Sequence, residues 1–160
     1  MHPFSQKTLE LKIPPVLVFL IFAFIMWKIP EFIKPFNVTI PLKELLIIFL
    51  MTMGAFTGIA SLLAFRMKKT TVDPRYPDNA SSLVVKGIYR RTRNPMYLAL
   101  LLILLAWAAY LSNPVTLAGA WGFYKYITLF QILPEERVLH EKFGTQYQNY
   151  ISSVNRWFSW

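Results

Sequence analysis

The chain has 160 residues, which gives room for one domain. Its residues are 55% hydrophobic, and its mean hydropathy is +0.40. The apolar residues form long runs rather than alternating with polar ones, so a membrane protein is indicated and an ordinary soluble domain is excluded. Cysteine is absent, which excludes disulfides, thiolate metal sites and cysteine nucleophiles. The two histidines, His2 and His140, cannot form a His-rich site, so we expect no metal.

The net charge of +9 indicates an anionic partner. In a membrane protein the simpler partners are anionic lipid headgroups, and basic residues also orient the chain in the bilayer. We therefore expect no nucleic acid. The six glycines form neither a G-x-G-x-x-G pattern nor a Walker loop, which argues against a Rossmann-type or P-loop nucleotide site.

The first apolar segment covers Ile13–Ile29. Lys7 and Lys12 precede it, as basic residues precede the apolar part of a signal peptide, but no A-x-A cleavage pattern follows. We predict an uncleaved helix that accommodates Pro14 and Pro15 in its first turn.

Leu45–Phe65 is the clearest transmembrane segment, with 21 apolar or small residues, or roughly the 20 that a bilayer requires. Gly54 and Gly58 form a GxxxG pattern that continues to Ser61. Such a stripe brings helix backbones close together, either in a dimer or within one chain, and we favour packing within the chain.

Two further apolar helices are predicted over Met96–Leu111 and Val115–Leu133. The three residues 112–114 between them are too few for anything but an antiparallel helical hairpin. The first of these two helices is short for a full span, so we expect it to continue into the interface at one end.

The distribution of Lys and Arg predicts the topology. The segment 66–93 carries eight of the 17 basic residues, whereas the loop 30–44 is balanced in charge. The eight are Arg66, Lys68, Lys69, Arg75, Lys86, Arg90, Arg91 and Arg93. About four transmembrane helices with both termini and the 66–93 loop in the cytoplasm satisfy this pattern.

The tail, residues 134–160, is predicted to be a cytosolic interfacial helix. Its apolar residues recur every three or four positions: Val138, Leu139, Phe143, Tyr147, Tyr150, Ile151 and Val154. Trp157, Phe158 and Trp160 suit the headgroup layer. We therefore predict an all-α membrane protein with one domain over 1–160, in which 1–66 holds two N-terminal transmembrane helices and 67–160 holds a functional core.

Two polar clusters are expected at the cytoplasmic face. In the first, Asn94 is a plausible N-cap and Pro95 a good first helical residue, so that free amides there would attract an anionic group. Taken singly, these residues also have structural readings, and Arg93 could simply anchor a phosphate. The second cluster is Glu135 and Glu136, whose carboxylates at a membrane exit need a cation, amides or water.

Together the stretches "LVVKGIYRRTRNPMYLALLL" and "EERVLHEKFGTQYQNYISSVNRW" resemble the isoprenylcysteine carboxyl methyltransferase and phospholipid methyltransferase superfamily. The resemblance covers about residues 79–157. It implies an integral-membrane enzyme that uses S-adenosylmethionine, held at the cytosolic surface by the 66–93 loop and the tail. The acceptor would be a membrane lipid or a lipid-like amphiphile.

The resemblance also assigns residues to the cofactor: Leu83, Val84, Gly87, Tyr89, Asn94, Pro95, Met96, Tyr97, Glu135 and Glu136. A carboxylate suits the positive groups of this cofactor, and a tyrosine ring could pack against its adenine or sulfonium. The catalytic residue stays open, with Arg93, Asn94 and Glu136 as candidates.

Two departures from the family pattern concern the substrate. Asn94 stands where many relatives have His, and Asn cannot act as a general base near neutral pH. In the prenylcysteine branch an Arg precedes the glutamates by about one turn, and here that position is Ile132. We therefore expect an acceptor other than a prenylcysteine carboxylate.

Lys125 lies deep in the last predicted transmembrane helix. At 100° per residue it would share a stripe with Leu129, Ile132 and Glu136. Either this stripe lines the path of a lipid substrate, or Lys125 merely extends its charged end towards water.

Two other classes of function remain open. Sterol reductases resemble this superfamily in their C-terminal half, so an NADPH-dependent membrane reductase is one alternative. A non-catalytic membrane scaffold with the same fold is the other. The sequence leaves open whether the accepting atom is oxygen, nitrogen or sulfur.

Overall fold

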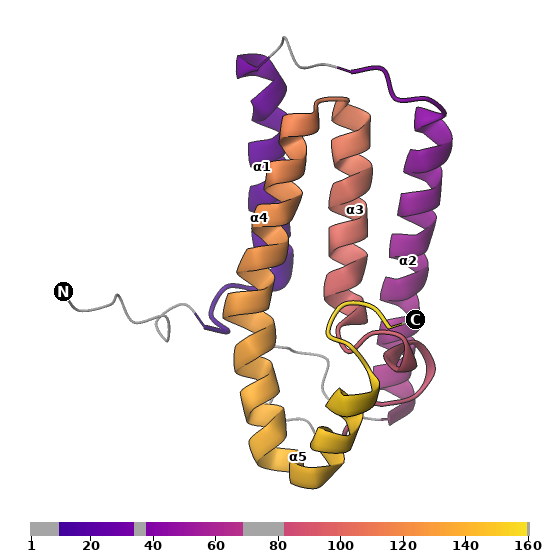
Figure 1. Ribbon diagram of the computed structural model, residues 1–160, viewed down its shortest axis with the longest axis vertical. Coiled ribbons are helices and arrows are strands. Elements are labelled where there is room, and N and C mark those ends of the chain that lie inside the picture. Colours follow the sequence, from indigo (N-terminus) through magenta and orange to yellow (C-terminus); the bar gives the residue numbers. More distant parts are fainter. Residues whose placement is uncertain (1–9, 34–37, 69–81, 160) are drawn as a thin grey trace, which may run out of the picture.

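The computed structural model describes residues 10–33, 38–68 and 82–159, which contain helices and no strands (Figure 1). Their elements are α1 (Pro15–Phe32), α2 (Lys43–Lys68), η4 (Gly87–Arg90), α3 (Pro95–Leu111), η5 (Pro114–Thr116), α4 (Leu117–Ile127), η6 (Thr128–Ile132) and α5 (Leu133–Ser153). The first four α-helices lie side by side in a bundle, and α5 continues from α4 beyond it. The all-α prediction is confirmed.

The predicted helices appear with small shifts at their ends. Prolines begin α1 at Pro15 and α3 at Pro95, where the missing amide hydrogen costs nothing. The helix α3 ends at Leu111, after which Ser112 takes a left-handed conformation (φ 54°). The predicted hairpin between α3 and α4 is confirmed (Figure 1).

Close helix packing occurs where glycines lie. A Cβ atom on Gly54 would come within 3.0 Å of Ile103 Cγ1 and 3.2 Å of the Ala99 carbonyl oxygen. The GxxxG stripe of α2 therefore packs on α3 of the same chain, as predicted. On the other side of the bundle, a Cβ atom on Gly119 of α4 would lie 2.3 Å from Met26 Cγ of α1.

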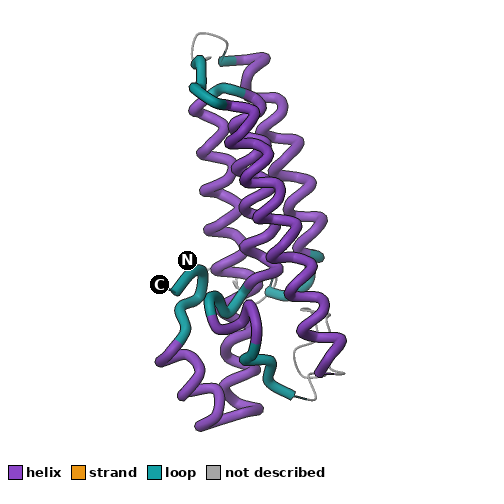
Figure 2. The backbone as a smooth tube through the Cα atoms, turned by 90° about the vertical axis from the view of Figure 1, so that its right-hand side faces the viewer, coloured by secondary structure: helices purple, strands orange, loops and turns teal. Residues whose placement is uncertain are grey.

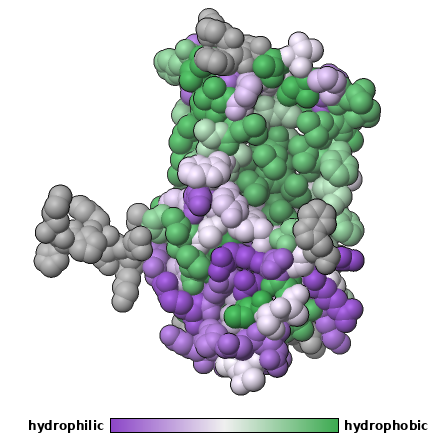
Figure 3. Space-filling model, viewed as in Figure 1, coloured by the Kyte–Doolittle hydropathy of each residue, from purple (hydrophilic) through white to green (hydrophobic). Residues whose placement is uncertain are grey.

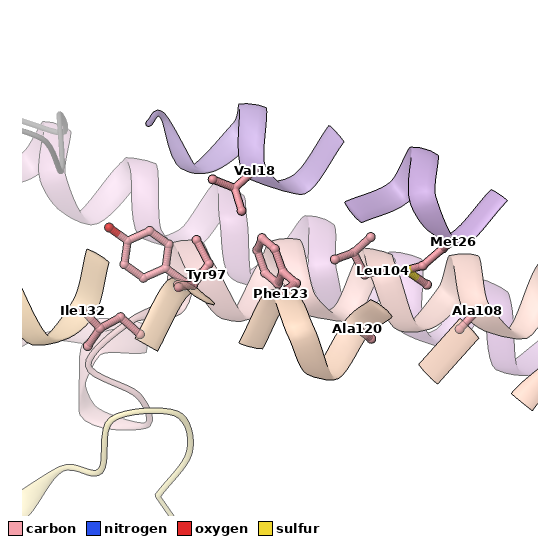
Figure 4. Close-up of a cluster of buried hydrophobic side chains, with 9 residues drawn as sticks. Val18, Met26, Tyr97, Leu104, Ala108, Ala120, Phe123 and Ile132 are labelled. Atoms are coloured by element: carbon pink, nitrogen blue, oxygen red, sulfur yellow. The ribbon is translucent and has the colours of Figure 1, made fainter. Parts of the chain in front are cut away.

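The core lies between α1, α3 and α4 (Figure 4). Phe123 is completely buried, and the rings of Phe19 and Phe22 meet it edge-on at 6.5 and 6.1 Å between centroids. The helix α3 contacts α1, α2 and α4, so it is the central helix of the bundle.

The bundle has an apolar outer surface and one polar end (Figure 3). Large hydrophobic side chains of α1 and α2 are exposed, among them Phe24 (58%) and Phe49 (60%). Both helices are long and apolar enough to cross a membrane. The helix α3 is apolar but has only 17 residues, and α4 is interrupted at η6. A membrane protein is indicated, and the number of spans stays a prediction.

The hairpin end of the bundle is closed by neutral hydrogen bonds. Asn113 is buried, and its Nδ2 donates to the carbonyl oxygen of Ile33 at 2.9 Å. Its Oδ1 accepts a hydrogen bond from the amide of Val115 at 3.1 Å. Val38 donates its amide to the Ser112 carbonyl at 2.8 Å, which ties the loop before α2 to the hairpin.

At the opposite end α5 bends back toward the bundle (Figures 1 and 2). The bend occurs at Gly144, with φ 48° and ψ −122°, a conformation that disfavours residues other than glycine. Its apolar face, predicted from the periodicity of the tail, is covered by protein: Tyr147, Tyr150 and Val154 pack with Ala64 of α2 and with Val84. The chain then runs through residues 155–159, which we call the C-terminal strap.

Candidate functional site

The C-terminal strap holds the turn that precedes α3. The backbone amide of Arg93 donates to the Asn155 carbonyl at 3.1 Å, and Ser159 donates its amide to the Arg91 carbonyl at 2.7 Å. The Arg156 carbonyl accepts from Asn94 Nδ2 at 2.9 Å and from Thr92 Oγ1 at 3.3 Å. Residues 91–94 are therefore fixed by a segment more than 60 positions later in the chain.

Arg156 of the strap and Arg93 converge on one carboxylate. Arg156 binds Glu136 through two parallel hydrogen bonds, Nε to Oε1 at 2.9 Å and Nη2 to Oε2 at 2.7 Å. Arg93 Nη2 lies 3.2 Å from Glu136 Oε1, and its side chain is 11% exposed. The hydrogen bonds to Glu136 raise the pKa of Arg156. Two guanidinium groups against one carboxylate leave this cluster with an excess positive charge.

Arg93 has unused bonding capacity in this cluster. Its Nε is buried and finds no hydrogen-bond acceptor among the residues that the structure describes. A buried donor without a partner costs free energy, so an anionic group from outside would be stabilised there.

The neighbouring carboxylate, Glu135, has different surroundings. Tyr97 donates its hydroxyl to Glu135 Oε2 at 3.1 Å, and no basic side chain in the described part of the chain pairs with Glu135. Burial of its carboxyl group raises the pKa of Glu135 from 4.5 to about 7; the Tyr97 hydrogen bond opposes this shift, and the charge of Glu136 adds to it. One glutamate is thus paired with two arginines, while the other can change its protonation near neutral pH.

Tyrosines form the wall next to the glutamates. The Tyr89 hydroxyl lies 2.7 Å from Ser61 Oγ, and Tyr150 donates its hydroxyl to the Tyr89 carbonyl at 2.7 Å. Burial raises the pKa of Tyr89 and of Tyr150, and it raises that of Tyr147 to about 12. All three phenols therefore stay neutral and act as structural groups at physiological pH.

An apolar groove of about 680 Å³ reaches this cluster from the side of the bundle. Its walls come from the start of α1, the middle of α2 and the first half of α3. They are Pro14, Pro15, Val16, Gly54, Ala55, Gly58, Ile59, Leu62, Met96, Tyr97, Ala99, Leu100 and Ile103. The groove exists because glycine and alanine have small side chains. Tyr97 connects it with Glu135, since its ring lines the groove and its hydroxyl donates to that carboxylate.

The family model for phospholipid methyltransferases matches residues 43–146, well over half of the chain. The chain belongs to the phospholipid methyltransferase family. It is also 48% identical over 62 residues to an uncharacterized protein of Haemophilus influenzae; the match covers 39% of this chain and 98% of that protein. Membership of the family indicates a membrane methyltransferase and, in general, use of S-adenosylmethionine. The matched range includes Arg93 and both glutamates but ends before the C-terminal strap.

The structure gathers most of the residues that the sequence assigned to the site of this methyltransferase. Tyr97, Glu135 and Glu136 meet, with Arg93 and Asn94 beside them. Leu83, Val84 and Tyr89 belong to the apolar cluster under α5, Pro95 is buried at the start of α3, and Met96 lines the groove. Gly87 has a positive φ of 65° and is exposed. Their contacts with a cofactor remain predictions.

The predicted N-cap position of Asn94 is confirmed, but its side chain does not cap the helix. Asn94 occupies the N-cap position of α3, but its side chain accepts no hydrogen bond from the first turn. Its amide nitrogen binds the Arg156 carbonyl instead. The tertiary contact with the C-terminal strap replaces the local cap, and such a contact has no signature in the local sequence.

The prediction that Lys125, Leu129, Ile132 and Glu136 lie on one face of a helix is wrong. The segment η6 is one turn of π-helix, which adds a residue and offsets all that follows by about 100° relative to a regular α-helix. Lys125 is exposed beside the rings of Trp121 and Tyr124, whereas Ile132 is completely buried. Leu129 is 45% exposed, so these residues do not line one path.

Sequence reasoning missed three polar residues of the site: Ser61, Thr92 and Arg156. Arg156 lay inside the stretch that carries the family resemblance, but only its partner Glu136 was singled out. Ser61 was read as part of a packing stripe, yet it also bonds Tyr89. The described residues contain no group of three or more His, Cys, Asp or Glu that could hold a metal ion.

Proposed function

We propose that this chain is an S-adenosylmethionine-dependent methyltransferase that acts on a lipid-phase amphiphile at the cytosolic face of the membrane. The observation that carries the proposal is the junction at Tyr97. Its ring lines an apolar groove, and its hydroxyl binds a carboxylate beside a cluster of two arginines. A hydrocarbon site thus adjoins a charged site.

The charged side fits the amino-acid part of the cofactor. A carboxylate could bind Arg93, whose buried Nε lacks an acceptor within the described chain, and an ammonium could bind Glu136. When bound, S-adenosylmethionine supplies an electrophilic methyl group on a positively charged sulfur. The residues of the site would orient the acceptor toward that methyl group and keep water away from it.

The apolar side fits the tail of the acceptor. The groove lies within the size range of small-molecule sites, and Tyr97 is the residue among its walls that carries a polar side chain. A lipid could keep its chain in the groove and place its polar head at the end of the bundle. A water-soluble acceptor would gain nothing from such walls.

The groups near the acceptor argue against a prenylcysteine carboxylate. Ile132 is completely buried and occupies the position at which the prenylcysteine branch carries an arginine. Arg156 is paired with Glu136 through two hydrogen bonds, and Arg93 is the residue that we assign to the carboxylate of the cofactor. Efficient methylation of a farnesylated cysteine in detergent would contradict this part of the proposal.

The orientation in the membrane rests on charge. Among the described residues, the site end carries Lys12, Arg66, Lys86, Arg90, Arg91, Arg93, Arg137, Lys142 and Arg156 against Glu10, Glu135, Glu136 and Glu141, whereas the hairpin end carries Lys28 and Lys43 against Glu31 and Glu44. The predicted loop residues Lys69 and Arg75 lie outside the described residues. Because the chain has no cysteine, Thr39→Cys and Lys86→Cys can each be labelled uniquely, and we expect them to react from opposite sides. Labelling from one side would refute the topology.

Cofactor binding is the deciding test. We would titrate the purified protein with S-adenosylmethionine and with NADPH by calorimetry. A charge-assisted contact is worth roughly 1.5–3 kcal/mol, so Glu136→Gln should weaken the binding of S-adenosylmethionine about ten- to a hundred-fold. The matched control is Glu141→Gln, an exposed glutamate on the same helix, which should bind normally. Binding of NADPH instead would indicate a reductase, and binding of neither would indicate a scaffold.

A further inference from the structure

We propose that Tyr97 and Glu135 form a proton relay that removes the proton of the acceptor during methyl transfer. This inference rests on the function proposed above, and it gives the two adjacent glutamates different roles. Glu136 is held by two guanidinium groups, whereas Glu135 is reached through a phenol.

The geometry places the relay between the two sites. Tyr97 comes from the first turn of α3, with its ring in the wall of the groove. Figure 4 shows its hydroxyl oxygen pointing away from Phe123 and out of the core cluster. That hydroxyl donates to Glu135 Oε2 at 3.1 Å, within the range in which a proton can be transferred. An acceptor head at the end of the groove would therefore meet Tyr97 before it meets any carboxylate.

The step balances as follows. The heteroatom of the acceptor forms a bond to the methyl group of the sulfonium donor, and the sulfur keeps the electron pair of its broken bond to carbon. The N–H, O–H or S–H bond of the acceptor breaks, and its electron pair stays on the heteroatom. Its proton moves to Tyr97 Oη while the phenol proton moves to Glu135 Oε2. Tyr97 ends neutral, and Glu135 ends as a carboxylic acid that returns its proton to water between turnovers.

The surroundings of Glu135 suit a base at neutral pH. Burial raises the pKa of Glu135 to about 7, so both protonation states are accessible near neutral pH. The titratable groups that act on it are Tyr97, Glu136, Tyr89 and Tyr147, and Arg93 and Arg156 neutralise Glu136. The phenols of Tyr89 and Tyr147 stay neutral there because burial raises the pKa of each. Asn94 cannot take this role, because a side-chain amide does not act as a base near neutral pH.

The first measurement needs no substrate. Infrared difference spectroscopy of the purified protein should show a protonated carboxyl group that titrates near pH 7. This band should vanish in Glu135→Gln and persist in Glu141→Gln. A band that survives in Glu135→Gln, or that titrates in the ordinary range of a glutamate, overturns the proposal.

The second measurement separates the two glutamates. The family resemblance assigns Glu135 and Tyr97 to the cofactor, whereas the relay predicts that Glu135→Gln and Tyr97→Phe bind S-adenosylmethionine within about threefold of the wild-type affinity by calorimetry, in contrast to Glu136→Gln. Turnover is measured with amphiphiles that carry amine, hydroxyl or thiol heads in mixed micelles, at saturating S-adenosylmethionine. The two relay variants should lose roughly 10²–10⁴-fold in kcat. The kcat of the wild type should fall below pH 7, and this fall should be absent in Glu135→Gln.

The outcomes are distinguishable. If the wild type neither binds S-adenosylmethionine nor methylates any of the amphiphiles, the proposed function fails and the relay fails with it. If the wild type is active but Glu135→Gln keeps its rate and pH profile, only the relay fails. If Glu135→Gln loses cofactor affinity as Glu136→Gln does, Glu135 is a cofactor ligand and the relay is wrong. Tyr97→Phe keeps the aromatic ring, so it tests the hydroxyl even where changes at Glu135 disturb folding.

Discussion

The two ends of the bundle each begin a helix with the dipeptide Asn-Pro, and they use it differently. At the hairpin end, Asn113 caps the turn that follows it by accepting from Val115, and it donates to Ile33. At the site end, Asn94 leaves the first turn of α3 uncapped and donates to Arg156 in the C-terminal strap. We call the turn at Asn113 the hairpin junction and the turn at Asn94 the site junction. The hydrogen-bond partners of the hairpin junction are all neutral, whereas the site junction lies next to the ion pairs of Glu136.

This difference shows that one local pattern can serve either stability or function, depending on what the rest of the chain brings to it. The segment opposite Asn113 is the end of α1, close to it in the bundle. The segment opposite Asn94 is a strap whose side chain Arg156 also holds Glu136. We therefore expect substitutions of Asn113 to change stability alone, and substitutions of Asn94 to change ligand binding as well.

The largest expected effect is on the pH dependence of stability, which Glu135 at the site end should cause. Glu135 has a folded-state pKa of about 7 against 4.5 in the reference state, so the folded chain binds more protons between these values and loses stability as pH rises through them. The penalty approaches its full value above pH 7 and amounts to roughly 3 kcal/mol. Glu135→Gln should remove it and raise the unfolding midpoint relative to the wild type at pH 8, with little gain at pH 4.5. Thermal unfolding in detergent at both pH values checks this, and an equal gain at both would contradict it.

Asn113→Ala should have the next largest effect. It leaves the partly buried Ile33 carbonyl and the Val115 amide without these partners, which should cost about 2–3 kcal/mol in the free energy of unfolding. The affinity of the folded fraction for S-adenosylmethionine should stay unchanged, because the hairpin lies at the far end of the bundle. Calorimetry and thermal unfolding of the same preparation measure both quantities. A loss of affinity without a loss of stability would contradict the claim that Asn113 serves stability alone.

Gly87→Ala should destabilise the segment that leads into the site junction. Its φ of 65° lies in the left-handed region, which costs a residue with a Cβ atom about 1–2 kcal/mol. Gly58→Ala is a suitable control, because that glycine is helical and an added Cβ meets Ala99 at an ordinary 3.5 Å. We expect Gly58→Ala to be neutral or stabilising, so a larger loss there than at Gly87 would contradict the argument.

Asn94→Ala should have the smallest effect on stability, about 1 kcal/mol, because the Arg156 carbonyl keeps its hydrogen bond from Thr92. The affinity for S-adenosylmethionine should nevertheless fall, since Asn94 positions the residue that holds Glu136. If Asn94→Ala loses stability but binds S-adenosylmethionine with normal affinity, the site junction serves stability alone, as the hairpin junction does, and the proposed difference between them is wrong.

The helices could be predicted from the sequence because hydrophobic runs and prolines are local signals. Pro15, Pro95 and the segment 112–114 set three helix ends close to the predicted positions. The stripe of Gly54 and Gly58 also predicted its neighbour correctly, because small residues allow close approach at whatever helix comes next.

Much of the site could not be predicted in this way. The bonds from Asn94 and Glu136 to Arg156 depend on the bend at Gly144, which returns the chain to the start of α3. The different surroundings of Glu135 and Glu136 depend on the rotation of α5, which the π-helical turn sets. Neither feature repeats along the sequence, so neither produces a pattern that periodicity can detect.

The π-helical turn also predicts an unusual genetic behaviour. Deleting one residue from a membrane helix normally disrupts packing on one side of the lesion and so prevents folding. A deletion within residues 128–132 would instead remove the extra residue of this turn and leave the apolar half of the helix still in register with α1 and α3. The residues beyond it, Glu135 and Glu136 included, would turn by about 100° and lose their partners. Such an allele would encode a protein that inserts into the membrane and accumulates there but has no enzymatic activity. Deletion of a single codon would then abolish activity without preventing assembly.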